Sequence, residues 1–166
     1  MRVKLLILLL MLGALGAGAL LFLHGDRVDY SHPGFRIIQA ENFDPGDIDG
    51  RVLYLDFWAS WCVPCRKSFP WMQEMVERYH SRGLRVVAVN LDQERDRMQA
   101  FVDEYGANFP IVLNPSFSLF RRHQLVGLPS AIIFDLGGGK PALVRVHQGF
   151  EENRSGELEE EIAGLL

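Results

Sequence analysis

Residues 54–65 read YLDFWASWCVPC, and they carry the clearest structural signal of the chain. The run 52–58 is apolar and aromatic except for Asp56, which is the pattern of a strand buried on both faces of a parallel sheet. Apolar side chains then recur at helical spacing as far as Tyr79, and Gly83 stands where the end of a helix is expected. The two cysteines of the stretch therefore lie at the junction between a buried strand and a helix.

Strands and helices alternate through the remainder of the chain. Apolar strands are expected at 84–89 and 111–113, helices at 95–105, 117–123 and 158–166, and a hairpin with strands at 131–134 and 143–146. This order predicts an α/β fold with a central mixed sheet flanked by helices. The charged runs at 92–97 and 157–161 are expected to be solvated helix faces.

Cys62 and Cys65 are the only cysteines of the chain. Two intervening residues place their sulfurs one helical turn apart, close enough to pair. The macrodipole and the unpaired N–H groups at the amino end of a helix favour a thiolate. We therefore expect Cys62, at the exposed tip, to be the nucleophile, and Cys65, turned inward, to be the resolving thiol.

Other uses of two cysteines fit the sequence less well. A zinc site needs further ligands at suitable spacing, and the five histidines stand apart in the sequence. Covalent haem attachment needs a histidine directly after the second cysteine, where this chain has Arg66. We therefore expect no metal and no cofactor, only a redox-active disulfide between Cys62 and Cys65.

The chain resembles the thioredoxin superfamily, and within it the membrane-anchored, extracytoplasmic TlpA/ResA type. Residues 54–65 match the family signature almost residue for residue. Pro70 matches the proline that kinks the active-site helix, and residues 127–130 (GLPS) match the Gly-x-Pro of the cis-proline loop. The helix and strand expected between residues 92 and 115 resemble the insertion of this branch. The resemblance covers residues 35–166 and implies a thioredoxin-like fold.

Asp56 interrupts the apolar strand six residues before Cys62. A buried carboxylate without a partner is costly enough to raise its pKa, which makes the group a proton carrier. Asp56 resembles the buried aspartate of thioredoxins, and the resemblance implies a catalytic role in deprotonating Cys65. Thioredoxins that keep this aspartate usually carry a lysine where this chain has Ala88.

Contacts with a protein substrate are implied by the same resemblance. The substrate-binding residues expected are Trp61, Val63, Pro64, Leu128 and Pro129. Trp61 adjoins the nucleophile and resembles the exposed contact surface of the family. A cis peptide bond before Pro129 would present the backbone of Leu128 to an extended substrate segment, offering strand-like hydrogen bonds without selecting a side chain.

The expected function is thiol-disulfide exchange on proteins. Val63 and Pro64 add no charge that would stabilise the thiolate further, so we expect a reductant closer to thioredoxin, at about −270 mV, than to strong oxidants near −120 mV. The resemblance implies a membrane thiol reductase as electron donor. It also implies either apocytochrome c thiols, in cytochrome c maturation, or copper-site assembly proteins as recipients. The net charge is −4 and the basic residues are scattered, so the sequence does not indicate a basic surface for binding nucleic acid.

Two alternatives to this function differ in class. One is a redox-switched protein-binding module whose cysteines change its affinity for a partner without turnover. The other is a thiol peroxidase on the related fold, which needs a Thr-x-x-Cys nucleophile. This chain has Ala59 where that threonine would stand, which disfavours the peroxidase.

Residues 5–23 form an uninterrupted apolar run behind Arg2 and Lys4. As a helix the run is roughly 28 Å long, close to the hydrocarbon thickness of about 30 Å, and the basic flank favours a cytoplasmic amino end. The expected division is a membrane anchor at 1–23, a linker at 24–34 and the thioredoxin-like domain at 35–166. The expected location is a bacterial inner membrane, single-pass, with the domain facing the periplasm or the exterior. The small-x-small pattern at 17–19 leaves a cleaved signal peptide as the alternative.

Overall fold

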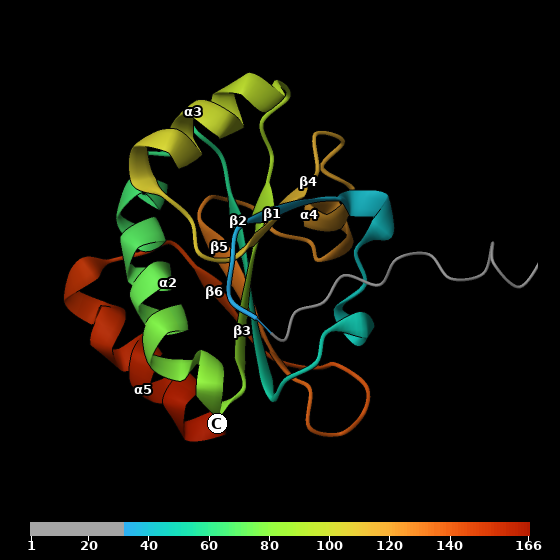
Figure 1. The fold of residues 1–166 in the computed structure, drawn as a ribbon, viewed down its shortest axis with the longest axis vertical. Coiled ribbons are helices and arrows are strands. Elements are labelled where there is room, and N and C mark those ends of the chain that lie inside the picture. Colours follow the sequence, from blue (N-terminus) through green and yellow to red (C-terminus); the bar gives the residue numbers. More distant parts are fainter. Residues whose placement is uncertain (1–31) are drawn as a thin grey trace, which may run out of the picture.

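The computed structural model describes residues 32–166, which form one sheet with helices on both faces (Figure 1). The sheet has six strands: β1 (Arg36–Gln39), β2 (Val52–Trp58), β3 (Leu84–Asn90), β4 (Pro110–Leu113), β5 (Ser130–Asp135) and β6 (Ala142–Gln148). The α-helices of the described residues are α2 (Cys65–Tyr79), α3 (Arg95–Tyr105), α4 (Ser118–Arg122) and α5 (Ser155–Leu165). Short 3-10 turns complete the fold: η1 (Ala40–Asn42), η2 (Pro45–Asp47), η3 (His80–Arg82) and η4 (Glu152–Arg154).

The sheet is mixed, with the strand order β1-β4-β3-β2-β5-β6. The first four strands in this order are parallel to one another, whereas β5 is antiparallel to β2 and β6 is antiparallel to β5. In the β2–β5 register Phe57 lies opposite Ser130. The start of β5 therefore lies beside the end of β2, so the loop before β5 and the loop after β2 share one edge of the sheet.

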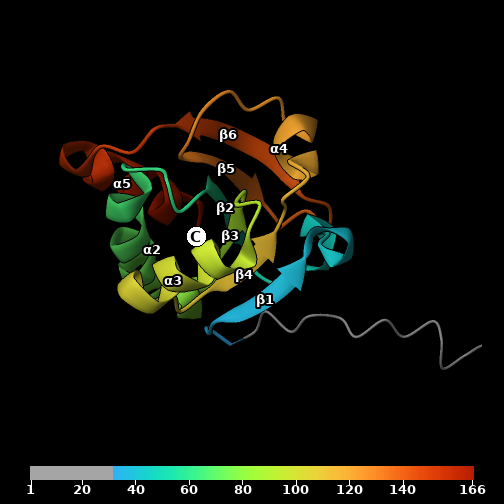
Figure 2. The same cartoon turned by 90° about the horizontal axis from the view of Figure 1, so that it is seen from above.

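Helices cover the two faces of the sheet unequally. Seen from above, α2, α3 and α5 lie on one face and α4 lies on the other (Figure 2). All seven residues of β2 are buried, because β2 is a central strand with a layer on each side. On the α2 face Phe69 packs against Trp58 and Phe101, with ring centroids 4.4 and 4.9 Å apart. This aromatic cluster fixes α2, and with it the cysteines, against the sheet.

The predicted α/β architecture is confirmed, including the buried strand 52–58 and the carboxyl-terminal hairpin. Pro70 lies inside α2, as the resemblance implied. The sequence pattern did not predict β1. This strand has four residues, of which only Ile38 is buried, so neither an apolar run nor a clear alternation marks it.

The predicted anchor or signal peptide at 1–23 lies outside the described residues, as does the predicted linker apart from 32–34. Within residues 32–166 no helix combines the length and the apolar character needed to cross a bilayer.

Candidate active site

Cys62 and Cys65 form a disulfide at the carboxyl end of β2, with an S–S distance of 2.08 Å and a Cα–Cα distance of 5.4 Å. Cys65 is the first residue of α2, and Cys62 lies in the turn that precedes the helix. The N–H of Cys65 donates to the carbonyl of Cys62 at 3.2 Å. The two sulfurs therefore occupy the junction that the sequence predicted.

Two expectations about Cys62 are wrong for this oxidised form. Cys62 is only 4% exposed, because its sulfur is bonded inward to the fully buried Cys65. The N–H groups of residues 65–68 are also not unpaired, since they donate to the carbonyls of Cys62, Val63 and Pro64. The helix macrodipole remains as the source of thiolate stabilisation, without orphan donors from this first turn.

Asp56 is buried, as predicted, at 1% exposure. Its neighbours across the sheet are Ala88 on β3 and Ala131 on β5, neither of which can pair with a charge. The Oδ2 atom is buried without a hydrogen-bond partner. Burial raises the pKa of Asp56 well above its ordinary value, so the neutral acid persists to higher pH than in an exposed aspartate.

Asp56 faces the same side of the sheet as the disulfide. Tyr54 and Trp58, two positions away on either side, belong to the core on the α2 face, which also contains Cys65. Because side chains alternate along a strand, Asp56 points into this face as well. Burial, and secondarily the charge of Asp56, raises the pKa of Tyr54. A strand and a helix thus bring an acid with an altered pKa and the inner cysteine into one core.

Exposed apolar side chains flank the disulfide. Trp61 is 59% exposed and Val63 is 66% exposed, while Pro64 is also exposed. Val126, at 79% exposure, precedes the Gly127-Leu128 segment and was not among the residues singled out from the sequence. Its position directly before the Gly-x-Pro motif was the signal that could have found it.

The loop before β5 carries the cis peptide bond between Leu128 and Pro129. The carbonyl of Pro129 accepts a hydrogen bond from the N–H of Gly149 at 2.8 Å. The hydroxyl of Ser130 donates to the carbonyl of Gly127 at 2.6 Å. These bonds hold the loop at the sheet edge that also carries the turn after β2.

The expectation that residues 92–97 form a solvated face is wrong for Asp92. Its carboxylate is only 5% exposed and accepts hydrogen bonds from Ser60, in the turn before Cys62. Residues 93–97 are exposed as expected. Sequence reasoning missed this contact because a charged residue in a sequence does not reveal its tertiary partner, although Asp92 lies two residues after a buried strand.

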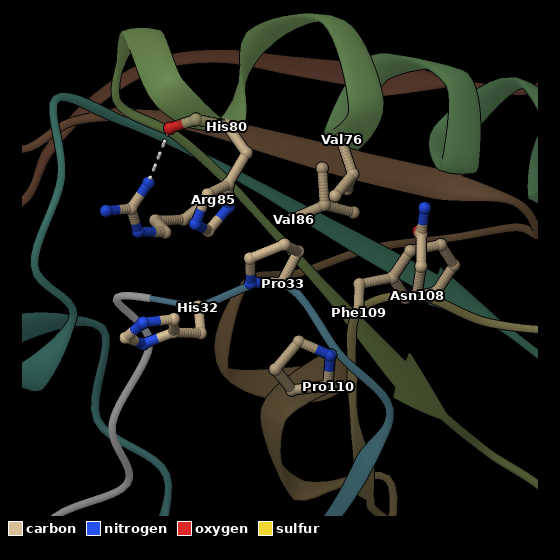
Figure 3. Close-up of a pocket in the computed structure, with 9 residues that line it drawn as sticks. All are labelled: His32, Pro33, Val76, His80, Arg85, Val86, Asn108, Phe109 and Pro110. Atoms are coloured by element: carbon tan, nitrogen blue, oxygen red, sulfur yellow. Dashed lines mark hydrogen bonds between the residues drawn. The ribbon is translucent and has the colours of Figure 1, made fainter.

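A small cavity lies at the opposite end of the parallel strands (Figure 3). It is lined in part by His32, His80 and Arg85, and the Arg85 guanidinium donates to the carbonyl of His80 at 3.0 Å. Its volume of about 10 Å³ is the space of a single water molecule. The cavity is therefore too small for an organic ligand, and it is separate from the disulfide. Within residues 32–166 no group of three or more His, Cys, Asp or Glu side chains could hold a metal ion.

Fold and site together define a thioredoxin-like domain with a disulfide at the turn between strand and helix. Residues 33–139 match the model of the AhpC/TSA family. The chain belongs to this family.

The chain is similar to several proteins named thiol-disulfide oxidoreductase ResA. It is 30% identical to that of Halalkalibacterium halodurans over 112 residues, which cover 68% of this chain and 62% of the relative. It is 30% identical to that of Bacillus subtilis over 99 residues, which cover 60% of this chain and 55% of the relative. The chain thus spans less than two thirds of the length of these two relatives. Against ResA of Bacillus thuringiensis it is 26% identical, with 81% and 82% covered.

The chain is also similar to proteins of known structure. A structure from Chlorobium tepidum, assigned as the thiol:disulfide interchange protein DsbE, has a TM-score of 0.66 and 39% identity, covering 70% of this chain and 80% of that chain. A secreted disulfide oxidoreductase of Mycobacterium tuberculosis has a TM-score of 0.59 at 21% identity, covering 74% of this chain and 88% of that chain. The second likeness shows the fold alone.

Proposed function

We propose that the protein is a thiol-disulfide oxidoreductase that reduces disulfides in other proteins. The observation that carries the proposal is the Cys62–Cys65 disulfide, placed at the strand-to-helix turn on the face that holds the buried acid Asp56. The ResA name shared by its relatives supports the same activity.

The proposed reaction begins with the reduced pair. The thiolate of Cys62 attacks one sulfur of a substrate disulfide, forming a mixed disulfide and releasing the other substrate sulfur as a thiolate, which takes up a proton. The thiolate of Cys65 then attacks the sulfur of Cys62, which frees the second substrate thiol and forms the Cys62–Cys65 disulfide. Two electrons pass to the substrate, so an external dithiol must reduce the pair before the next cycle.

Asp56 serves this reaction as a proton acceptor and donor. Cys65 is fully buried, so its thiol needs a nearby base before it can attack Cys62. Burial raises the pKa of Asp56 well above its ordinary value, and a group that exchanges protons works best when its pKa is shifted toward the operating pH. The neutral acid also avoids the cost of an unpaired buried charge while the disulfide is intact.

Substrate binding is assigned to the apolar rim and the cis-proline loop. Trp61, Val63 and Pro64 offer exposed apolar surface beside the disulfide. The backbone of Leu128, which precedes the cis bond to Pro129, would pair with an extended substrate segment. Such recognition through the main chain suits an enzyme that acts on several proteins.

The proposal extends to cellular setting and direction. Residues 1–23 would anchor the protein in a bacterial inner membrane, residues 24–34 would link it, and the domain at 35–166 would face the periplasm or the exterior. The uncharged Val63 and Pro64 support a reducing potential, which requires an electron donor such as a membrane thiol reductase. The recipients would be the cysteines of apocytochrome c in their disulfide form, which the reaction returns to thiols for cytochrome c maturation, or copper-site assembly proteins.

Turnover in vitro tests the activity. The purified full chain, with dithiothreitol as electron source, should accelerate the reduction of insulin. A redox-switched binding module would bind partners without accelerating this reaction, so a rate equal to that of dithiothreitol alone contradicts the proposal. The reduction potential of the Cys62/Cys65 pair gives the direction, with a value nearer −270 mV than −120 mV expected.

The membrane assignment has its own test. The full chain expressed in a bacterium should stay in the membrane fraction after a carbonate wash, because the run at 5–23 is long enough to span the bilayer. Recovery as a soluble species beginning near Leu20 would show that the segment is a signal peptide.

A further inference from the structure

We propose that Asp92 is a positioning residue that fixes the turn carrying Cys62 to the end of the sheet. This inference rests on the proposed function, because it assigns Asp92 a role in placing the nucleophile of that reaction. Asp92 belongs to the loop after β3 and lies outside the Cys-x-x-Cys motif and the cis-proline loop.

The carboxylate of Asp92 accepts three hydrogen bonds at once. The N–H of Ser60 donates to Oδ2 at 2.9 Å, and the hydroxyl of Ser60 donates to Oδ1 at 2.8 Å. The side-chain amide of Asn90 donates to Oδ2 at 2.8 Å. At 5% exposure these bonds are shielded from water, and hydrogen bonds to a charged acceptor are stronger than those between neutral groups.

The two residues that bond to Asp92, Asn90 and Ser60, are themselves held in place. Asn90 is the last residue of β3, is 1% exposed, and accepts a hydrogen bond from the N–H of Asp92 at 3.1 Å. Ser60 lies inside a turn that is closed by the N–H of Cys62 donating to the carbonyl of Ala59 at 3.0 Å. Asp92 therefore connects a rigid strand end to the turn that ends at the nucleophile.

Placement of this turn bears directly on the rate of attack. A thiolate must approach a disulfide sulfur in line, and a misplacement of about 1 Å can cost on the order of 100-fold in rate. Without Asp92 the turn would keep its own backbone bond but lose both Ser60 bonds to the carboxylate. The expected consequence is a wider spread of Cys62 positions and slower attack.

Substitution by asparagine separates hydrogen bonding from charge. In Asp92→Asn the amide oxygen can replace Oδ2 as the acceptor for Ser60 and Asn90. The amide nitrogen can donate to the Ser60 hydroxyl, which is able to rotate and accept. All three bonds are then kept without the negative charge. Asp92→Ala removes all three and leaves the Ser60 N–H and the Asn90 amide without this partner.

Asn114 offers a matched control at the end of the neighbouring strand β4. It is fully buried, donates to the Ser118 hydroxyl at 2.8 Å and accepts from the N–H of Leu119 at 3.1 Å. These side-chain bonds hold the start of α4, not the turn before Cys62. Asn114→Ala should therefore lower the free energy of unfolding about as much as Asp92→Ala without moving the nucleophile.

The experiment measures how fast Cys62 attacks a small aromatic disulfide, 5,5′-dithiobis(2-nitrobenzoate). The reduced full chain carries Cys65→Ser so that Cys62 is the only thiol. Rates are measured across pH and compared at their high-pH limit, where the thiolate is fully formed, and are corrected for the folded fraction from urea unfolding. Asp92→Ala should be slower by about tenfold or more. Asp92→Asn and Asn114→Ala should stay within about twofold of the parent, and Ser60→Ala should fall between these extremes.

Two results would overturn the inference: a folded Asp92→Ala variant that reacts at the parental rate, or an Asp92→Asn variant as slow as Asp92→Ala. The second would mean that the charge matters and the bonds do not. If Asp92→Ala does not fold, a Ser60→Ala rate equal to that of Asn114→Ala overturns the inference. The reagent is not a protein, so a failure of insulin reduction with this pattern of rates intact would count against the proposed function alone.

Discussion

The two ends of the parallel strands differ in how many polar side chains are buried there. Among residues 32–166, the buried polar or charged side chains are Asp56, Ser68, Asn90, Asp92, Asn114 and Ser130. All of them lie toward the end of the sheet that carries the disulfide. At the opposite end, within the same described residues, Arg85 pairs at 3.4 Å with an exposed Asp49, and the polar atom buried without a hydrogen-bond partner is Oδ1 of the half-buried Asn108.

This difference between the two ends indicates which of them carries the reaction. Burying a polar group is costly unless hydrogen bonds replace those lost to water, and Asp56 lacks a partner for one oxygen. An ion pair with an exposed partner, such as Asp49 opposite Arg85, contributes only about 1 kcal/mol or less. The residues that are polar and buried as a whole, Asp56 among them, gather at the end where Cys62 and Cys65 lie, which is expected if that end performs the reaction.

The largest expected effect tests the contrast itself. Cys62→Ser should abolish insulin reduction, because it removes the attacking sulfur. Arg85→Ala, at the other end, should leave kcat/KM of the folded protein within about twofold, since the bonds of Arg85 to Asp49, His80 and Leu84 lie at the end of the sheet opposite the disulfide. Steady-state kinetics of both variants measure this. A large loss of activity in a folded Arg85→Ala protein would break the assignment of chemistry to one end.

The next effect concerns the buried acid. Asp56→Asn should slow disulfide exchange near neutral pH by roughly tenfold to a hundredfold, because the amide cannot accept the proton of Cys65. Stopped-flow measurement of oxidation of the reduced pair by a protein disulfide gives the rate. The slowing should shrink as pH rises and Cys65 ionises without help. An unchanged rate together with a much less stable fold would make Asp56 a structural residue.

A smaller effect is expected at the apolar rim. Trp61→Ala should raise KM for insulin several-fold while kcat changes little, because Trp61 is exposed and contributes binding surface rather than chemistry. Stability should change by about 0.5 kcal/mol or less. Leu143→Ala is the matched control, since Leu143 is 55% exposed near the start of β6, at the other end of the sheet. Equal changes in KM for the two variants would contradict the assignment.

The smallest effect is a change in how stability depends on pH. Because burial raises the pKa of Asp56, the folded protein holds this proton more tightly than the unfolded chain. As pH rises above the ordinary pKa of 3.8, the unfolded chain loses the proton first, so the contribution of Asp56 to the free energy of unfolding falls until the folded pKa is passed. Asp56→Asn lacks this dependence. Urea unfolding of the oxidised proteins should show the variant gaining on the parent from about pH 4 upward, and a difference independent of pH would contradict the burial argument.

Much of the fold could be predicted because it rests on local patterns. The strand 52–58 is a continuous apolar run, and its burial on both faces follows from that run alone. The same holds for β3, where six of seven residues are buried. By contrast β1 is set by pairing with β4 rather than by its own four residues, so no local signal marked it.

In the candidate site, too, some features could be predicted from the sequence and others could not. The positions of Cys62, Cys65 and Asp56 follow from one short motif and were predictable. The burial of Asp92 was not, because its bonds to Ser60 join residues 32 positions apart. The low exposure of Cys62 in the disulfide was not predictable either, because burial by distant parts of the chain leaves no local pattern in the sequence.

The order of attack, first by Cys62 on substrate proteins and then by Cys65 on the mixed disulfide, can be tested directly. Cys62→Ser and Cys65→Ser variants of the full chain are expressed in cells, and mixed disulfides are resolved by non-reducing electrophoresis. Cys65→Ser should accumulate covalently attached partners, because nothing can release them. Cys62→Ser should trap almost none, because Cys65 is fully buried. Equal trapping by both variants, or none by either, would contradict the account.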